Sequence, residues 1–318
     1  MTTKTLPKRA ILFDHDGSAD DFLSLVLLLT MKEINLLGIS ITPADCFLED
    51  AISTTLKILS IAKKKEIEIS TGRFHGINAF PVEWRAKPKI LNALPDLVTI
   101  DTPFAVDQFK ESTEMFAQRI LTSKEPVSIL MTGPCTNLVH ALDKTPAIKE
   151  KIEEIVWMGG AVDVEGNVKT YNHAGTAEWN VYWDPIASNK LLQHKLPLTI
   201  IPLDACNQVP VSIEFLKQLS SQSEYLYSRL AGQFWATTID TIPSYEYIYF
   251  MWDVLATSYL DIPEAFVTEE MELNVHPTGP NSGNTERKKG TDQWVKVAKS
   301  VNKSYFYDYL LKQFKYTP

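Results

Sequence analysis

Short runs of consecutive apolar residues alternate with longer amphipathic segments over most of the chain. The first run covers residues 10–13, and a second apolar stretch, residues 22–29, follows after a polar segment rich in acids. A continuous apolar run of this length is typical of a strand that is buried on both faces of a sheet. Acids placed before an apolar stretch suit the N-terminus of a helix. We therefore predict a strand, a turn at Gly17 and a helix.

The same alternation recurs further along the chain. Buried strands are predicted over residues 35–42, 66–70, 126–132, 154–158 and 198–203, and helices over residues 48–64 and 107–122 and from Pro185 onwards. Thr136 is predicted to cap the helix that follows the turn at Gly133-Pro134. Repeated strand–turn–helix units favour an α/β fold with a single doubly wound, mainly parallel sheet flanked by helices.

The last third of the chain has a different pattern. Helices are predicted over residues 212–230 and 247–260 and strands over 266–275 and 293–297, with an exposed polar loop over 281–290. Residues 71–89 form a predicted loop with several aromatic side chains, and a loop of that length inside a compact domain is usually functional. No change of composition marks a linker, so residues 1–318 are expected to form one domain.

Composition narrows the class of protein without naming an activity. The chain has 318 residues, 45% of them hydrophobic and 22% charged, and a net charge of −8. An acidic chain lacks the basic stripe that binding to a nucleic-acid backbone needs, so no nucleic-acid partner is expected. No apolar run is long enough to cross a bilayer, and the N-terminal residues contain no signal core, so no membrane partner is expected either.

The cysteines indicate the compartment. Cys46, Cys135 and Cys206 are far apart and follow no metal-ligand spacing. They are expected to pack as small apolar residues in a reducing environment. The chain is therefore predicted to be a cytoplasmic globular protein.

Four carboxylates stand close together between the first strand and the first helix, namely Asp14, Asp16, Asp20 and Asp21. In an open α/β sheet, ligands bind in the crevice at the carboxyl ends of the strands, where these acids are expected. Like charges this close repel one another unless a cation or a shared proton compensates them. The cluster therefore predicts a cation or ligand site, and the alternative is a solvated acidic loop that caps a helix.

Part of this cluster resembles the Asp-x-Asp-Gly-Thr signature of the haloacid-dehalogenase-type phosphatases. The matching residues are Phe-Asp-His-Asp-Gly-Ser at positions 13–18, and Met131-Thr132 resembles the second motif of that family. The resemblance implies a Mg²⁺-dependent phosphatase with Asp14 as the nucleophile. No late strand ends in the Gly-Asp pair that would complete such a site, and Asp20 and Asp21 have no role in it. The phosphatase is kept as the alternative function.

The whole cluster resembles more closely the Asp-x-Asp-Pro-Gly-x-Asp-Asp signature of the nucleoside hydrolases. Later motifs of that family match in order: Thr-Gly-Pro-Cys-Thr-Asn at 132–137, Met-Gly-Gly-Ala at 158–161, Glu-Gly-Asn at 165–167, Gly-Thr-Ala-Glu-Trp-Asn at 175–180 and Trp-Asp at 252–253. The beginning Asp-His-Asp-Gly resembles the purine-specific inosine–adenosine–guanosine branch. Gly17-Ser18 replaces the usual Pro-Gly, a change that this branch tolerates.

The resemblance implies a purine nucleosidase that hydrolyses the N-glycosidic bond of inosine, guanosine and adenosine in purine salvage. Such a reaction passes through an oxocarbenium-like sugar, as other glycosidic cleavages do. The resemblance also implies a small-molecule nucleoside as the partner, a homodimer or homotetramer, and bound Ca²⁺. A nucleoside-binding protein with a degraded site is a third interpretation, which the intact acids disfavour.

The metal site of the family, carried over by position, consists of Asp16, Asp21, the carbonyl oxygen of Thr132, and Asp253. Oxygen ligands are those that a hard cation such as Ca²⁺ prefers. Asp16 is also the implied general base, because the cation raises the acidity of the water that attacks the sugar. His15 is expected beside these acids as a supporting residue.

Acids and amides also form the implied contacts to ribose, whose hydroxyls both donate and accept hydrogen bonds. The resemblance assigns Asp14 and Asn180 to the 2′ side, Asp20 and Asp253 to the hydroxyls around the metal, Glu178 and Asn167 to the 5′-hydroxyl, and Met158 to the space under the ring. Asn172 replaces Asn167 if the loop is threaded differently. An ordinary strand end is the alternative for residues 178–180.

Two tryptophans carry the implied specificity for purines. By resemblance, Trp84 and Trp252 stack on both faces of the base, and stacking on an aromatic face favours the protonated, cationic base that leaves. Trp252 stands where pyrimidine-active relatives usually carry a histidine. Asp45 matches an acid that contacts the base, and Tyr249 matches a tyrosine near a mobile lid. Residues 242–249 lack the arginine- and aspartate-rich sequence typical of that lid.

Overall fold

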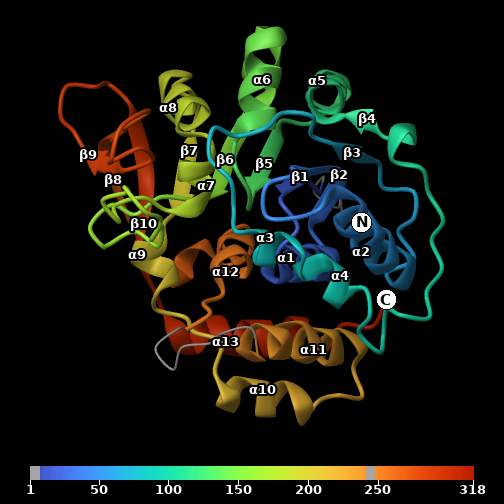
Figure 1. The fold of residues 1–318 in the computed structure, drawn as a ribbon. Coiled ribbons are helices and arrows are strands. Elements are labelled where there is room, and N and C mark those ends of the chain that lie inside the picture. The colour runs from blue at the N-terminus through green and yellow to red at the C-terminus, as the bar shows by residue number, and fades with distance from the viewer. Residues whose placement is uncertain (1–7, 241–247) are drawn as a thin grey trace, which may run out of the picture.

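A sheet of ten strands forms the centre of the molecule, with the strand order β4-β3-β2-β1-β5-β6-β7-β10-β8-β9 (Figure 1). The computed structural model describes residues 8–240 and 248–318. Neighbouring strands from β4 to β10 are parallel, whereas β8 is antiparallel to both β10 and β9. The predicted α/β fold with a mainly parallel sheet is thus confirmed.

Strands and helices alternate along most of the chain. The strands are β1 (Arg9–His15), β2 (Ile34–Ile41), β3 (Ile69–Thr71), β4 (Lys110–Glu111), β5 (Val127–Met131), β6 (Ile152–Met158), β7 (Leu198–Ile201), β8 (Phe266–Val275), β9 (Thr285–Arg287) and β10 (Trp294–Val301). The α-helices are α1 (Ala19–Thr30), α2 (Leu48–Ile61), α3 (Val82–Arg85), α4 (Lys87–Leu91), α5 (Ser112–Thr122), α6 (Thr136–Lys144), α7 (Trp179–Trp183), α8 (Pro185–Gln193), α9 (Leu203–Cys206), α10 (Ile213–Ser220), α11 (Leu226–Asp240), α12 (Trp252–Ser258) and α13 (Lys303–Gln313). Within the described ranges, no helix is both long and apolar enough to cross a membrane.

Alternate residues of the central strand face two separate cores. Ile11 and Phe13 of β1 lie in a core with α1, α2, α11, α12 and α13. Ala10 and Leu12 lie in a second core with α5, α6 and α8. Helices therefore cover both faces of the sheet, as Figure 1 shows. Burial on both faces is the reason why the central strands are largely apolar.

Several predicted boundaries differ from the structure. The helix predicted over residues 212–230 is two helices, α10 and α11, because a turn at 221–224 interrupts it. The helix predicted over 107–122 begins only at Ser112, after the short edge strand β4. The loop predicted over 71–89 contains the short helix α3 and the beginning of α4, which ends at Leu91. Apolar periodicity does not mark breaks of this kind, because both halves of an interrupted helix can keep the same apolar face.

Other differences arise from contacts between distant segments. The polar loop predicted over 281–290 contains β9, which forms because β8 supplies its hydrogen-bond partners. The residue before α6 is Cys135, not Thr136, whose hydroxyl instead donates to Asp184 at 2.9 Å. The helix predicted over 247–260 begins at Trp252, and its first predicted residue lies outside the described residues. Helix α13 was not predicted.

Candidate active site

The carboxyl ends of β1, β2 and β5 meet at one edge of the sheet. Asp14 is in register with Ser40 of β2 and with Met131 of β5. The backbone N–H of Thr132 donates to the carbonyl oxygen of Asp14 at 2.9 Å, which extends the pairing one residue beyond β5. The acids that follow β1 therefore lie beside Thr132, as expected of a ligand crevice in an α/β sheet.

Two glycines allow the backbone to pack closely around Asp16. Gly17 has a φ of +89°, and a Cβ there would lie 2.6 Å from Cβ of Cys46. A Cβ on Gly133 would lie 2.8 Å from Cβ of Asp16. Any larger residue at either position would push the β1 turn away from its neighbours.

Asp21 both caps α1 and contacts Thr132. The Asp21 carboxylate accepts the backbone N–H of Ser18 at 2.7 Å, and the Ser18 hydroxyl accepts the backbone N–H of Asp21 at 3.3 Å. This reciprocal pair is a capping box. The other oxygen of Asp21 accepts the hydroxyl of Thr132. Asp21 thus does cap a helix, as the alternative interpretation of the acidic cluster predicted. Its side chain also contacts Thr132 at the end of β5.

Asp253 reaches the cluster from the other end of the chain. It lies in the first turn of α12, and the Ser18 hydroxyl donates to its Oδ2 at 3.2 Å. Asp20 holds α12 in this place, since its Oδ2 accepts the backbone N–H groups of Asp253 at 2.6 Å and Val254 at 3.1 Å. Its Oδ1 accepts Nε1 of Trp235 at 2.9 Å. Asp20 therefore uses both oxygens within the protein.

Asp16 is surrounded by like charges. It is 3% exposed, and its Oδ2 has no hydrogen-bond partner. Burial raises the pKa of Asp16 well above its usual value, and the charges of Asp21, Asp45 and Asp253 raise it further. Crowded, buried carboxylates of this kind are stabilised when a cation joins them.

The residues present fit a hard cation. Asp16, Asp21 and Asp253 offer carboxylate oxygens, and the carbonyl of Thr132 has two lone pairs, only one of which is used by Asn180 at 2.8 Å. Across residues 8–240 and 248–318, no three His, Cys, Asp or Glu side chains already form a metal centre. The acids would therefore have to draw together around the ion.

Asp14 lies at the end of a buried polar network. Its Oδ1 accepts the hydroxyl of Thr42 at 3.0 Å, and Asn137 donates to Thr42 Oγ1 at 2.7 Å and lies 3.5 Å from Asp14 Oδ1. Burial raises the pKa of Asp14 to about 7, although hydrogen bonds from Ser40, Thr42 and Asn137 act in the opposite direction. Its Oδ2 remains unpaired. Sequence reasoning did not assign Thr42 or Asn137, although Asn137 ends a matched motif.

Glu178 and Asn180 lie at the carboxyl ends of β5 and β6. Glu178 caps α7 and accepts backbone N–H groups of Asn180 at 2.9 Å and Gly160 at 3.1 Å. Asn180 donates to the carbonyl oxygen of Met158 at 3.1 Å as well as to Thr132. Burial raises the pKa of Glu178 to about 7. Residues 178–180 thus begin a helix and do not form a strand end.

The loop before Glu178 distinguishes the two candidate asparagines. Oδ1 of Asn167 accepts the backbone N–H of Trp179 at 3.2 Å, which places this side chain beside Glu178. Asn172 is exposed and has a φ of +65°. The threading that the structure shows therefore brings Asn167, and not Asn172, to the predicted 5′ side.

The aromatic residues predicted to hold a base lie in two groups. The ring of Trp84, 36% exposed, is 5.3 Å from that of Trp179. The ring of Trp252 is 4.6 Å from that of Tyr249, and its Nε1 is buried without a partner. No ring contact joins Trp84 to Trp252 in the part of the chain that the structure describes. Residues 242–247 of the predicted lid segment lie outside that part.

Asp45, predicted to contact the base, and His15, predicted to support the acids, lie in different surroundings. Oδ1 of Asp45 is buried and unpaired. Burial raises the pKa of Asp45 well above its usual value, and the nearby charge of Asp21 raises it further. The ring of His15 stacks on Phe13 at 5.1 Å, and its Nε2 lies 3.4 Å from the hydroxyl of Thr55. Burial lowers the pKa of His15 to about 4, which keeps the ring neutral.

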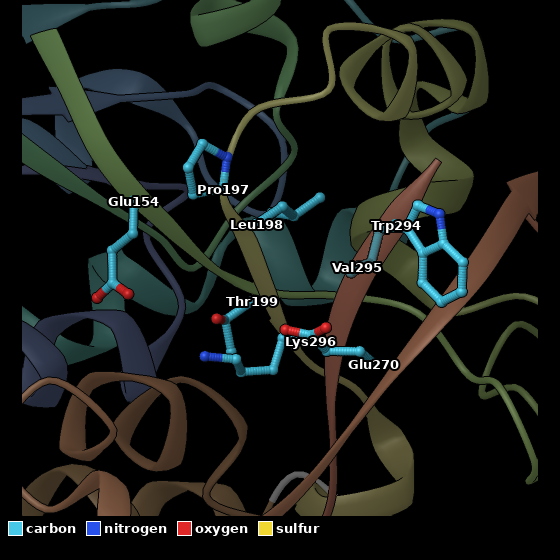
Figure 2. Close-up of a pocket in the computed structure, with 8 residues that line it drawn as sticks. All are labelled: Glu154, Pro197, Leu198, Thr199, Glu270, Trp294, Val295 and Lys296. Atoms are coloured by element: carbon cyan, nitrogen blue, oxygen red, sulfur yellow. The ribbon is translucent and has the colours of Figure 1, made fainter. Parts of the chain in front are cut away.

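Two surface pockets are lined by residues other than these acids. One, of about 180 Å³, lies near the amino-terminal ends of β7 and β10, at the opposite edge of the sheet, and includes Pro197 and Trp294 (Figure 2). The other, of about 590 Å³, borders the loop after β6 and includes Asp163 and Thr176. The three cysteines are buried and free, as predicted from their spacing.

Known proteins resemble the chain over most of its length. The inosine-uridine preferring nucleoside hydrolase family matches residues 11–308. The pyrimidine-specific ribonucleoside hydrolase RihA of Shewanella sp. (strain MR-4) is 26% identical over 212 residues, which cover 66% of this chain and 64% of that protein. The match thus spans slightly less than two thirds of this curated relative.

Solved structures share the fold. The inosine-uridine preferring nucleoside hydrolase from Bacillus anthracis is 34% identical, with a TM-score of 0.89 over 96% of this chain and 99% of that chain. The purine-preferring ribonucleoside hydrolase from Gardnerella vaginalis is 23% identical, with a TM-score of 0.81 over 96% and 98% of the two chains. At that identity the second likeness concerns the fold alone.

Proposed function

This chain belongs to the inosine-uridine preferring nucleoside hydrolase family, and from that premise we propose that it hydrolyses the N-glycosidic bond of purine ribonucleosides to ribose and a free base. The observation that carries the proposal is the meeting of Asp16 and Asp21 with the distant Asp253 at the edge where Asn180 and Glu178 also lie. The phosphatase alternative has no use for Asp253, and the family match over residues 11–308 disfavours it.

The family is metal-dependent, and we assign Ca²⁺ to Asp16, Asp21, Asp253 and the carbonyl oxygen of Thr132. An ion held by these residues would supply Lewis acidity that makes the attacking water easier to deprotonate. The unpaired Oδ2 of Asp16 then takes the proton from the attacking water. The burial of Asp16 supports this role, since a carboxylate removed from bulk water is a stronger base.

Ribose binding follows from the polar groups around the acids. Asp14 and Asn180 are assigned to the 2′ side, and Asn167 and Glu178 to the 5′-hydroxyl, with Met158 under the ring. Asp253 contacts the remaining hydroxyls. Asp20, whose oxygens both accept protein hydrogen bonds, acts on the sugar by holding Asp253.

Purine preference is assigned to the aromatic residues. Trp84 and Trp252 are placed on the two faces of the base, with Tyr249 beside Trp252 and Asp45 on the base edge. Pyrimidine nucleosides are the second candidate substrates, because RihA from Shewanella is pyrimidine-specific.

A direct assay tests the proposal. The purified chain is incubated with inosine, guanosine, adenosine, uridine and cytidine, with Ca²⁺ or with a chelator, and free base and ribose are measured by chromatography. We expect base release from purine nucleosides that the chelator abolishes. Faster release from uridine or cytidine would reassign the specificity, and nucleoside binding without turnover would indicate a binding protein.

The remaining assignments concern the whole chain. We propose that residues 1–318 form a single domain that acts in the cytoplasm, in purine salvage, as a homodimer or homotetramer. The continuous sheet from β4 to β9 supports a single domain. Light scattering of the purified chain would measure the oligomeric state, and a monomer at micromolar concentration would contradict this part of the proposal.

A further inference from the structure

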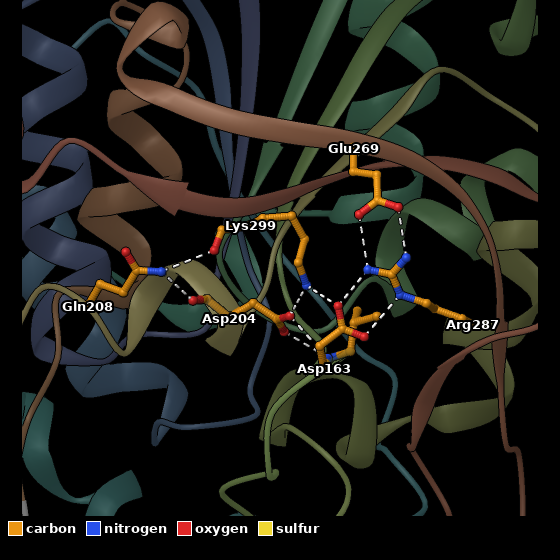
Figure 3. Close-up of polar contacts among 7 residues, drawn as sticks. Asp163, Asp204, Gln208, Glu269, Arg287 and Lys299 are labelled. Atoms are coloured by element: carbon orange, nitrogen blue, oxygen red, sulfur yellow. Dashed lines mark hydrogen bonds and ion pairs between the residues drawn. The ribbon is translucent and has the colours of Figure 1, made fainter.

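A second group of charged residues lies beside the candidate site, at the carboxyl end of β7. Asp204, in α9, is 6% exposed. Its Oδ2 accepts the backbone N–H of Val162 at 2.9 Å, and its Oδ1 accepts the backbone N–H of Asp163 at 3.0 Å. Lys299 of β10 forms an ion pair with the same carboxylate (Figure 3). One buried side chain thus fixes two successive residues of the loop after β6.

Further ion pairs extend this group to the surface. Nζ of Lys299 lies 2.5 Å from Oδ2 of Asp163. Arg287 of β9 contacts both oxygens of Asp163, at 3.0 and 2.5 Å, and both oxygens of Glu269, at 2.8 and 3.0 Å. Hydrogen bonds from Arg287 and Lys299 lower the pKa of Asp163 to about 2. The loop after β6 is therefore tied to β8, β9 and β10, as Figure 3 shows.

The restrained loop leads directly to Glu178. The backbone N–H of Leu203, next to Asp204, donates to the carbonyl oxygen of Gly160 at 2.9 Å. The N–H of the same Gly160 donates to Oε2 of Glu178 at 3.1 Å. Gly160 has a φ of +89°, which glycine adopts without strain. Because glycine can also adopt many other conformations, contacts from outside the loop must select this one. The contacts of Leu203 and Asp204 therefore restrain the Gly160–Ala161 peptide and the two residues after it. This segment adjoins the Gly160 N–H that contacts the Glu178 carboxylate.

We propose that Asp204, paired with Lys299, is a positioning residue that sets the orientation of Glu178 and with it the selectivity for a substrate 5′-hydroxyl. The inference rests on the proposed function, which places Glu178 at that hydroxyl. Asp204 touches no substrate; it acts through Val162, Gly160 and Glu178 in turn. Its buried negative charge is compensated by Lys299, which also pairs with Asp163. Removing either partner of the Asp204–Lys299 pair would therefore disturb the charge balance that stabilises the loop.

The test compares a substrate with its 5′-deoxy analogue. In Asp204→Asn the side chain keeps one acceptor but presents an N–H₂ group to the second backbone N–H, and it loses the ion pair with Lys299. We expect kcat/KM for inosine to fall by about tenfold, the effect of one misplaced hydrogen bond to a charged group. For 5′-deoxyinosine, which has no hydroxyl for Glu178 to bind, we expect little change. If the wild type cleaves uridine faster than inosine, uridine and 5′-deoxyuridine are used as the two substrates instead.

Three variants accompany Asp204→Asn. Lys299→Met removes the ion pair but leaves both acceptor oxygens of Asp204, so we expect a smaller loss of the preference for inosine over 5′-deoxyinosine. This variant keeps the proposal testable if Asp204→Asn folds poorly. Glu178→Gln should abolish the selectivity, and adding Asp204→Asn to it should cause no further loss. Asp143→Asn is the matched control, because it breaks a similar ion pair with Lys190, 2.5 Å long, between α6 and α8; it should behave as the wild type.

Equal losses on both substrates, unchanged selectivity, or additive effects with Glu178→Gln would overturn the proposal. Amide hydrogen exchange separates it from the proposed function. In Asp204→Asn, but not in Asp143→Asn, we expect faster exchange at Gly160 and Asn180, whose N–H groups donate to Glu178. If the wild type cleaves no nucleoside, the proposed function fails, and unchanged exchange at these two amides would then overturn the positioning role independently.

Discussion

Asp16 combines burial, an unpaired oxygen and three neighbouring acids, which together suit a general base. In Asp16→Asn the side chain keeps its size but cannot take a proton. We expect kcat to fall by roughly 10²–10⁴-fold, the usual contribution of a general base. Steady-state assays measure the change, with Asp107→Asn, an exposed position, as the control. A rate close to that of the wild type would exclude Asp16 as the base.

Trp252 and Trp84 decide between purines and pyrimidines in the proposed site. In Trp252→His we expect kcat/KM for inosine to fall by about tenfold or more, because stacking contributes about 1–3 kcal/mol per base. A gain in uridine cleavage would support the specificity argument. Trp84→Ala should raise KM for purine nucleosides, and unchanged purine kinetics in this variant would contradict the stacking arrangement.

Glu178 makes a pH-dependent contribution to stability. Its pKa is raised from 4.5 to about 7, so the folded state binds a proton more tightly than the unfolded state. Its contribution is complete below pH 4.5 and is lost as the pH rises through about 7. Thermal melts of wild type and Glu178→Gln from pH 5 to pH 8 should therefore show the variant gaining relative stability as the pH rises. A constant difference would contradict the raised pKa.

At the scale of elements, Asp20 joins α1 to α11 and α12 through three hydrogen bonds. In Asp20→Asn the new N–H₂ group faces backbone donors, which leaves at least one of them unpaired in a buried place. We expect the free energy of unfolding to fall by about 1–3 kcal/mol. Urea denaturation measures the loss, again against Asp107→Asn. Because Asp253 lies in the first turn of α12, weaker Ca²⁺ binding should accompany the loss of stability. A fully stable variant with normal Ca²⁺ binding would contradict this role.

At the scale of the whole molecule, a bound cation should stabilise the fold. The acids of β1 and α1 meet Asp253 only when the chain is folded, so an ion that joins them binds the folded state alone. We expect Ca²⁺ at 100 times its Kd to add about 2.7 kcal/mol to the free energy of unfolding. Calorimetry with Ca²⁺, with Mg²⁺ and with a chelator measures the effect. Identical melting temperatures in all three would argue against a resident metal.

Local sequence already determined much of this protein. Largely apolar runs such as β5 predicted strands buried on both faces, and every residue of β5 is buried. The acids after β1 predicted a ligand site at the carboxyl edge, and ordered motifs predicted the family that the match over residues 11–308 shows. These features are visible in sequence because they depend on residues close together in the chain or on short matched segments.

Tertiary structure alone decided which distant groups meet. Ser18 contacts Asp253, Trp235 contacts Asp20, and Asp204 restrains the loop that contains Gly160. The sequence next to each of these residues is compatible with many different partners, so it does not identify the one that the fold selects. The strand β9 and the division of α10 from α11 likewise depend on neighbours that local periodicity does not record. Hydrophobic pattern fixes which side of an element is buried, whereas the packing of the whole sheet and its helices selects what it is buried against.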